Sequence, residues 1–447
     1  MNKIRLSANV LFSGIGCQEY GIKQTDLFDL DVKVTSDINK DSILSYAILH
    51  CGLTKELVEH YAEYPSLQEM QKELFDKNIG YDFKSNTVYD WFGKDEFTIK
   101  KIWLATKLSN NMGDISKIEE LPYADLWTVS FPCTSISASG KMNGLDEGSN
   151  TASSLLWEQI RLLKISKSKN QNPKFILFEN VTNLISKLFI HSFQQLIDIL
   201  TNLGYNCYYN IINSKDCGIP QNRERLYCIC IRNDIDNKQF RFPIQFDKNV
   251  RVVDILENIY DNNCIKACYS NNVELNKECY NSHKLFPLLI SNYNKYYVTR
   301  PNEIITLADI KSDNGLCSST TLKEKLHQGN RIFDINGISP TITASGGGLG
   351  GSSGLFLIFD NNLNVYVIRQ LNGIECYRLM GISVSNDHIK AFNDFNVTDN
   401  QMSFQAGNGI VTNIIELIFE HIYKALYDNA FVCEDEKLGR IKNKKLF

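Results

Sequence analysis

The sequence lacks the features that mark several common classes of protein. No hydrophobic run approaches the roughly 18 residues that a membrane-spanning helix requires, so no membrane segment is expected. The short apolar piece at residues 10–15 ends in glycine and cysteine without the small-residue cleavage site of a signal peptide. We therefore expect a cytoplasmic protein, and 447 residues are enough for two or three domains.

Charge and cysteine content exclude further classes. Lys and Arg number 47 against 51 Asp and Glu, so the net charge of −4 does not by itself indicate a nucleic-acid partner, and any positive potential must be local. Thirteen cysteines, an odd number, favour reduced thiols over a disulfide framework. The spacing of Cys264, Cys268 and Cys279 is a poor zinc pattern, so no metal is expected.

A strand that leads to a cysteine organises the rest of the chain. The run Leu126 to Phe131 is apolar, and Pro132 ends it because proline cannot donate a hydrogen bond to a sheet ladder. Cys133 is therefore expected at the carboxyl edge of a sheet, where α/β proteins bind ligands. A free cysteine is more often buried and inert, so a reactive role depends on the motifs that accompany it.

Two acids follow candidate strands in the first 120 residues. Residues 9–16 predict a strand that enters a glycine turn, but the spacing is not GxGxxG and does not imply phosphate binding. Asp37 ends a second strand and is placed to accept hydrogen bonds from ribose hydroxyls, although a helix-capping role fits equally well. Asp114 either ends a strand and reaches a cofactor base or belongs to a plain turn.

Polar residues also follow the next apolar strand. Residues 175–178 lead into Glu179 and Asn180, and a carboxylate rarely ends such a run unless it is paired or functional. Strand alternation places Gln221, Arg223 and Arg225 on one face, and two adjacent guanidiniums predict an anion between them. Strands that end near residues 13, 36, 131 and 178, each followed by helical or turn sequence, predict a parallel sheet covered by helices, with one crevice at its carboxyl edge.

The remaining segments carry weaker signals. The aromatic residues near Trp91 predict local core, and the serine- and glycine-rich residues 137–150 predict either a mobile lid or an ordinary surface loop. Residues 241–340 show no regular alternation of helix and strand. Residues 369–381 predict a helix with Glu375 and Arg378 one turn apart, and residues 414–426 predict an apolar helix.

Together these motifs resemble those of the cytosine-5 DNA methyltransferase family. They occur in the family's order, and the resemblance covers most of residues 8–231 and 331–425, while residues 51–110 look like an insertion relative to compact members. The departures are mild: Asn372 stands where threonine is common, Gly409 where serine is common and Ala152 where a basic residue is frequent. The motifs are Phe12-Ser13-Gly14-Ile15-Gly16, Phe131-Pro132-Cys133 with Ser137, Glu179-Asn180-Val181, Gln221-Asn222-Arg223-Glu224-Arg225, Arg369 to Gly381, and Gly407-Asn408.

The resemblance implies an α/β fold with a Rossmann-like S-adenosylmethionine-dependent methyltransferase domain and a smaller, irregular target-recognition domain. Residues 1–243 would form the catalytic domain, with residues 405–430 returning to it. Residues 244–368 would form the recognition domain, residues 369–404 would connect and support it, and residues 431–447 would form a basic tail.

The resemblance also assigns chemical roles. Cys133 would add to C6 of cytosine, a protonated Glu179 would act at N3, and Asn180 would orient the base and the neighbouring loop. Arg225 would hold the O2 edge of the base, and Arg223 would pair with an acid or a phosphate. S-adenosylmethionine, released as S-adenosylhomocysteine, would be bound by Phe12, Ser13, Gly14, Ile15, Gly16, Asp37, Ile38, Asp114, Ile115, Pro132, Leu155 and Asn408.

The implied substrate is a cytosine flipped out of a specific sequence in double-stranded DNA. DNA contacts would come from residues 244–368 and from Ser137, Lys141, Gln221, Arg331, Thr341 and Thr343, with phosphate contacts supplying most of the affinity. We expect a monomer, with a cognate restriction endonuclease as a candidate partner. The competing hypotheses are a tRNA cytosine-5 methyltransferase, a non-catalytic DNA-binding homologue and a nicotinamide dehydrogenase, which the missing GxGxxG disfavours.

Overall fold

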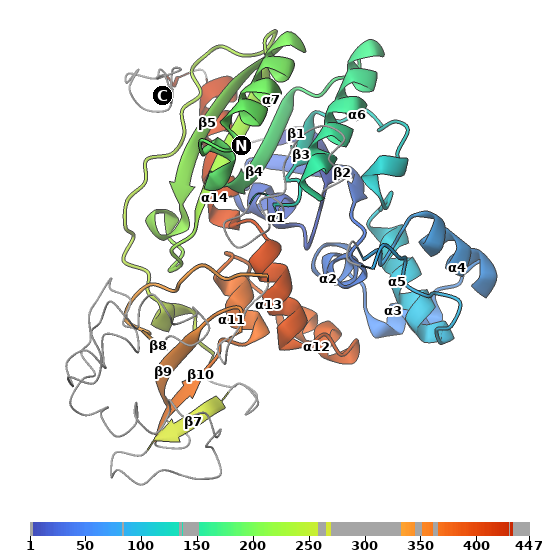
Figure 1. The fold of residues 1–447 in the computed structure, drawn as a ribbon, viewed down its shortest axis with the longest axis vertical. Helices are drawn as coiled ribbons and strands as arrows, with labels where there is room; N and C mark the ends of the chain where they lie inside the picture. The colour runs from blue at the N-terminus through green and yellow to red at the C-terminus, as the bar shows by residue number, and fades with distance from the viewer. Residues whose placement is uncertain are drawn as a thin grey trace.

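A six-stranded sheet with helices on both faces forms the main body of the molecule (Figure 1). The structure is a computed structural model. It describes residues 3–82, 85–133, 136, 152–257, 265–269, 332–344, 351–360, 365–428 and 430–431.

The strands of the main sheet lie in the order β2-β1-β3-β4-β6-β5. Neighbours from β2 to β4 pair in parallel, which confirms the parallel sheet predicted for these four strands. Strand β6, which lies beyond them, is antiparallel to both β4 and β5. The reason is the short connection at residues 214–223, because a parallel crossover needs a dozen or more residues. The strands are β1 (Ile4–Leu11), β2 (Phe28–Ser36), β3 (Leu126–Val129), β4 (Phe175–Val181), β5 (Tyr205–Asn213) and β6 (Glu224–Arg232).

Side-chain alternation along the strands builds two apolar cores. On β4, Phe175 and Leu177 join the core that contains α1 (Cys17–Gln24) and α14 (Thr412–Tyr427). The alternate residues Ile176 and Phe178 join the core of the opposite face, which contains α6 (Leu156–Ser168) and α7 (Ile190–Asn202). Helix α14 lies against α1, so the last described helix packs on the first.

A helical lobe extends from the β2 side of the sheet (Figure 1). It consists of α3 (Lys55–His60), α4 (Leu67–Asp76) and α5 (Glu96–Leu108), and α5 packs against α2 (Lys40–Cys51). A capping box between Ser66 and Glu69 begins α4. Trp91 is fully buried in this lobe, which confirms local core there, although its neighbour Phe92 is largely exposed.

A second sheet lies on the other side of the molecule from the helical lobe, with three short helices between them (Figure 1). Its strand order is β7-β10-β9-β8, so the described part of residues 244–368 is more regular than the sequence suggested. The strands are β7 (Ile265–Tyr269), β8 (Ile332–Asp334), β9 (Leu355–Asp360) and β10 (Val365–Arg369), and the helices are α11 (Gly373–Arg378), α12 (Asn386–Asp394) and α13 (Asp399–Asn408).

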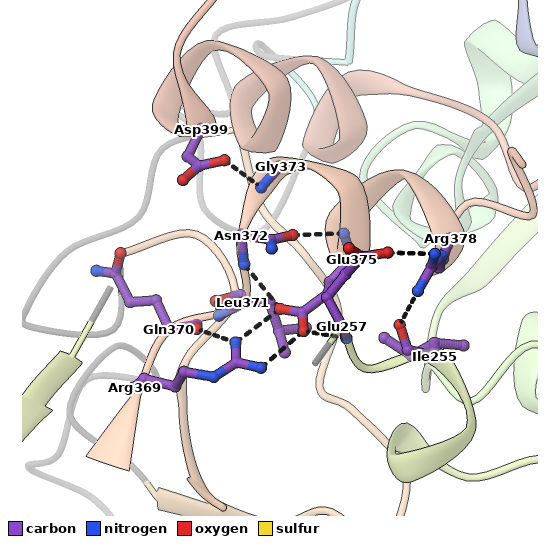
Figure 2. Close-up of polar contacts among 11 residues, drawn as sticks. Ile255, Glu257, Arg369, Gln370, Leu371, Asn372, Gly373, Glu375, Arg378 and Asp399 are labelled. Carbon is purple, nitrogen blue, oxygen red and sulfur yellow. Dashed lines mark hydrogen bonds and ion pairs between the residues drawn. The ribbon is translucent and has the colours of Figure 1, made fainter. Parts of the chain in front are cut away.

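A buried ion pair joins the end of β10 to α11 (Figure 2). Arg369 donates to both carboxylate oxygens of Glu375 at 2.7 Å, and both side chains are inaccessible to solvent. Arg378 pairs instead with Glu257 and donates to the carbonyl of Ile255. Glu375 and Arg378 are one turn apart, as the sequence indicated, but each finds its charged partner outside the helix.

Candidate functional site

A cavity of about 320 Å³ opens where β1, β2, β3 and β4 end. It brings together groups that the sequence placed at separate strand ends. The predicted residues that line it are Phe12, Ser13, Gly14, Ile15, Asp37, Ile38, Asp114, Ile115, Pro132, Cys133, Leu155, Glu179, Asn180, Arg223, Arg225 and Asn408.

The glycine turn forms one wall of this cavity. Phe12 and Gly14 both have a φ of +53°, and the backbone amide of Gly14 donates to Asp37 at 2.8 Å. Gly16, which was predicted with them, is not a lining residue and instead caps α1 with a φ of +80°. A Cβ there would lie 2.3 Å from Nε2 of His50, so glycine is required for both conformation and space.

Asp37 fixes the turn rather than capping the following helix. Its second oxygen accepts the backbone amide of Asn39, and Asn39 itself is the N-cap of α2. The capping interpretation of Asp37 was therefore wrong. Burial raises the pKa of the Asp37 carboxyl, while the amides of Asn39 and Gly14 lower it.

Asp114 combines the two roles that the sequence left open. It caps the short 3-10 helix Ile115–Lys117, where one oxygen accepts the amide and hydroxyl of Ser116, and it also lines the cavity. Its other oxygen accepts Nδ2 of Asn78 at 2.7 Å. A turn aspartate is thus also a candidate ligand-binding group.

Cys133 and Glu179 face the same cavity from neighbouring segments. Strand β3 ends at Val129, so Cys133 lies on the loop beyond it, whereas β4 continues to Val181 and holds Glu179 within the strand. Burial raises the pKa of Glu179, and the guanidiniums of Arg225 and Arg223 oppose this shift without reversing it. Burial and the charge of Glu179 raise the pKa of the Cys133 thiol, and the same two guanidiniums lower it.

Asn180 holds the loop that carries Cys133. Its Nδ2 donates to the carbonyl of Phe131 at 3.0 Å, and its Oδ1 accepts the amide of Val181. The hydroxyl of Ser153 donates to the carbonyl of Pro132 at 2.7 Å. These bonds fix the backbone on both sides of the proline.

The two arginines have different partners. Nε of Arg225 lies 3.2 Å from Glu179, so a carboxylate lies beside the guanidiniums as the sequence indicated. Arg223 is buried and donates to the carbonyls of Ile342, Gly407 and Gly409 at 2.7–3.0 Å, so its hydrogen bonds go to the backbone and not to an acid. Burial, followed by the charge of Arg225, lowers the pKa of Arg223 to about 10.

Gln221 was wrongly expected to contact DNA. Its side chain is fully buried, where Nε2 donates to the carbonyl of Leu379 and Oε1 accepts the amide of Ile342. It precedes β6, which begins at Glu224, so strand alternation does not govern its direction. The hydroxyl of Thr341 donates to the carbonyl of Asn222, and Thr343 is half-buried beside Gly407. Ser137, Lys141, Arg331 and the proposed lid at 137–150 lie outside the described residues.

Sequence analysis missed several residues around the cavity. Oδ1 of Asn111 accepts the amides of Asp37 and Gly113, so one side chain ties together the two segments that carry the acids. Tyr81, from the segment at residues 51–110 that looks like an insertion relative to compact members, lines the cavity, as does the exposed Phe404. Asp114, three residues further along the chain, was the available signal for Asn111, but the bond to Asp37 depends on tertiary structure.

The described ranges hold neither a metal site nor a membrane helix. No group of three or more His, Cys, Asp or Glu side chains in them could hold a metal ion. No helix in the same ranges is both long and apolar enough to cross a membrane.

Two solved structures share the fold. They are the S. pombe Dnmt2 methyltransferase, with a TM-score of 0.50 at 17% identity, and the Entamoeba histolytica methyltransferase EhMeth, with a TM-score of 0.51 at 15% identity. Each match covers 95% of this chain, and 100% and 99% of the respective structures. The α/β fold class is therefore confirmed, and the structural match extends over almost the whole chain.

Sequence relatives identify the family. The Type II methyltransferase M2.ScrFI of Lactococcus lactis subsp. cremoris is 30% identical over 418 residues, or 93% of this chain and 98% of that protein. The Type II methyltransferase M.HhaI of Haemophilus parahaemolyticus is 28% identical over 70% of this chain and 81% of its own length. The orphan methyltransferase M.SssI of Spiroplasma monobiae is 27% identical over 92% and 95%. The family model described as C-5 cytosine-specific DNA methylase matches residues 86–424, so the chain belongs to that family of DNA (cytosine-5-)-methyltransferases.

Proposed function

We propose that this methyltransferase acts on a cytosine flipped out of a specific duplex DNA sequence, through a covalent bond between Cys133 and C6 of the base. S-adenosylmethionine would be the methyl donor. The observation that carries the proposal is a single cavity lined by a thiol, a carboxyl of raised pKa and a separate pair of acids on a glycine-turn framework. In this proposal the nucleophile, the proton donor and the cofactor site would be adjacent.

The lining residues fit S-adenosylmethionine. Phe12, Ile38 and Ile115 supply apolar surface for a purine, while Asp37 and Asp114 supply acceptors for ribose hydroxyls and an exocyclic amine. The volume of about 320 Å³ lies in the range of small-molecule sites. When bound, the cofactor supplies an electrophilic methyl group on a sulfonium.

Cys133 begins the reaction because C5 of cytosine is a poor nucleophile until something adds to C6. The thiolate attacks C6, forming an S–C6 bond while the electrons of the C5–C6 double bond move toward N3. A charged Glu179 would raise the pKa of the thiol, whereas Arg225 and Arg223 lower it. A neutral Glu179 therefore favours the thiolate, so the two groups are best suited to the reaction in opposite protonation states.

Glu179 relieves the negative charge that develops on the ring. Burial favours its neutral form, which donates a proton to N3 and leaves C5 as the carbon of an enamine. After C5 takes the methyl group, a base removes the C5 proton and the S–C6 bond breaks. The C5–C6 double bond re-forms, Cys133 leaves as a thiolate, and N3 returns its proton to Glu179.

Arg223 and Asn180 would act as positioning residues in this scheme. Arg223 joins the carbonyls at 342, 407 and 409, and Asn180 holds the carbonyl of Phe131. Arg225 stays beside Glu179, where it would face the O2 edge of the base. Rigid support of this kind keeps the reacting atoms aligned.

The target cytosine must flip out of the DNA duplex to enter this cavity, which costs a few kcal/mol. We assign reading of the DNA sequence to residues 244–368, support to residues 369–404, and catalysis to residues 1–243 with 405–430. We further propose that the enzyme is a cytoplasmic monomer, with or without a cognate restriction endonuclease. Thr341 and Thr343 remain candidate DNA contacts.

Methyl transfer to duplex DNA and to tRNA, with labelled S-adenosylmethionine, tests the proposal. We expect 5-methylcytosine at one short motif in the duplex and none in the Cys133→Ser variant. Methylation of an exocyclic amine would contradict the chemistry, and methylation of tRNA alone would contradict the substrate.

A further inference from the structure

A turn in the helical lobe forms part of the wall around the proposed cofactor site. We propose that Asn78, in this turn, is a positioning residue that fixes the Asp114 carboxylate for the exocyclic amine of an adenine ring. This inference rests on the proposed function, because it assumes that Asp114 binds S-adenosylmethionine. It gives a role to the segment at residues 51–110, which the family motifs do not cover.

The turn at residues 77–81 is hydrogen-bonded to both segments that carry the cofactor acids. The amide of Gly80 donates to the carbonyl of Ile38 at 2.6 Å, one residue beyond Asp37. The amide of Asp114 donates to the carbonyl of Lys77 at 3.0 Å. A Cβ on Gly113 would lie 2.3 Å from that same carbonyl, so the two backbones are in direct contact.

A relay of side chains runs from this turn to the cavity. Nζ of Lys117 donates to Oδ1 of Asn78 at 2.8 Å, and Nδ2 of Asn78 donates to Oδ2 of Asp114 at 2.7 Å. The Lys117 ammonium can only donate, so the oxygen of the Asn78 amide must face it. The Nδ2 group of Asn78 is then directed to the Asp114 carboxylate. Asp114 is held on its other oxygen by Ser116.

Both carboxylate oxygens of Asp114 therefore have fixed donors. Ser116 uses both lone pairs of Oδ1, whereas Oδ2 accepts only from Asn78 and keeps one lone pair. An exocyclic amine offers a donor to such a lone pair, whereas a carbonyl at the same ring position offers only an acceptor. Without Asn78 the Oδ2 atom would lose the donor that sets its direction. The discrimination between amine and carbonyl, and not only the overall affinity, should then decrease.

Binding of two ligands to the intact enzyme measures this directly. The probes are S-adenosylhomocysteine and S-inosylhomocysteine, in which a carbonyl replaces the amine, with calorimetry as the readout. The test variant is Asn78→Gly, because Asn78 has a φ of +56° that glycine adopts without strain. The matched control is Asn170→Gly, since Asn170 has the same φ but is exposed at the end of α6, outside the cavity lining.

We expect Asn78→Gly to weaken S-adenosylhomocysteine binding about tenfold and S-inosylhomocysteine binding less than about twofold, as for the loss of one charge-assisted hydrogen bond. Lys117→Met should weaken S-adenosylhomocysteine binding by a smaller factor, and it should again weaken S-inosylhomocysteine binding less. Asn170→Gly should change neither affinity.

If Asn78→Gly lowers the affinity for both ligands equally, or for neither, the proposed role of Asn78 is overturned. If Asn78→Gly fails to fold, the ratio of the two affinities in Lys117→Met decides the question in the same way. Failure of the wild-type enzyme to bind S-adenosylhomocysteine would instead refute the proposed function, and this inference with it.

Discussion

Replacing Glu375 by glutamine isolates the contribution of the buried ion pair between β10 and α11 (Figure 2). The carboxylate of Glu375 accepts four hydrogen bonds: two from Arg369, one from the amide of Asn372 and one from the amide of Glu257. Glutamine has nearly the same shape but keeps a single acceptor oxygen. Its amino group would face donors, and Arg369 would remain charged with no access to water.

The expected cost is about 3–5 kcal/mol, the usual penalty for leaving one partner of a buried pair uncompensated. The exposed pair of Lys72 and Asp76 provides a matched control, because exposed pairs contribute less than about 1 kcal/mol. Asp76→Asn should therefore change the free energy of unfolding only slightly. The double variant Arg369→Met with Glu375→Gln should be destabilised by less than the sum of its two single variants, because it leaves no buried charge unpaired.

Urea denaturation followed by tryptophan fluorescence measures these differences. A cost below about 1 kcal/mol for Glu375→Gln would refute the reasoning, since it would mean that water or rearrangement compensates Arg369. Full additivity in the double variant would show equally that the two side chains do not interact as the distances indicate.

Three further predictions concern the cavity. Glu179→Gln should slow single-turnover methyl transfer by about 10²–10⁴-fold, as expected for loss of a general acid, with S-adenosylhomocysteine affinity unchanged by calorimetry. A second prediction concerns the pKa of Glu179, which burial raises above its ordinary 4.5. The folded state therefore holds the proton more tightly than the unfolded chain. The stabilisation from this proton is complete below pH 4.5 and is lost as the pH rises through the raised pKa. Urea midpoints of the wild-type protein should decline over that pH range, and this decline should be absent in Glu179→Gln. Arg223→Met should lower the free energy of unfolding by about 2–4 kcal/mol in the same assay, because three buried carbonyls lose their donor; a loss below about 0.5 kcal/mol would contradict this.

The strand-end motifs could be predicted because each depends on a few adjacent residues. An apolar run followed by glycine, acid or cysteine marks the carboxyl end of a strand, and the structure brings Phe12, Asp37, Asp114, Cys133 and Glu179 to one cavity. That placement follows from βα topology, which local sequence reveals.

Features that depend on distant contacts could not be predicted in this way. Gln221 and Arg223 are buried by segments more than 100 residues away in the chain, near Ile342, Leu379 and Gly407. Arg378 lies at helical spacing from Glu375, yet Glu375 pairs with Arg369. Arg369, at the end of β10, is fully desolvated and donates to both carboxylate oxygens of Glu375. Nothing in the local sequence ranks these partners.

The central claim is that the sulfur of Cys133 bonds to C6 of a cytosine in DNA. A duplex that contains 5-fluorocytosine at the methylated position blocks the final loss of the C5 substituent, so the S–C6 bond cannot break. Denaturing gel electrophoresis and peptide mass spectrometry should then show a DNA adduct at Cys133 in the presence of S-adenosylmethionine, and none in Cys133→Ser. Clean separation of protein and DNA in denaturant, under conditions where unmodified duplex is methylated, would contradict the account.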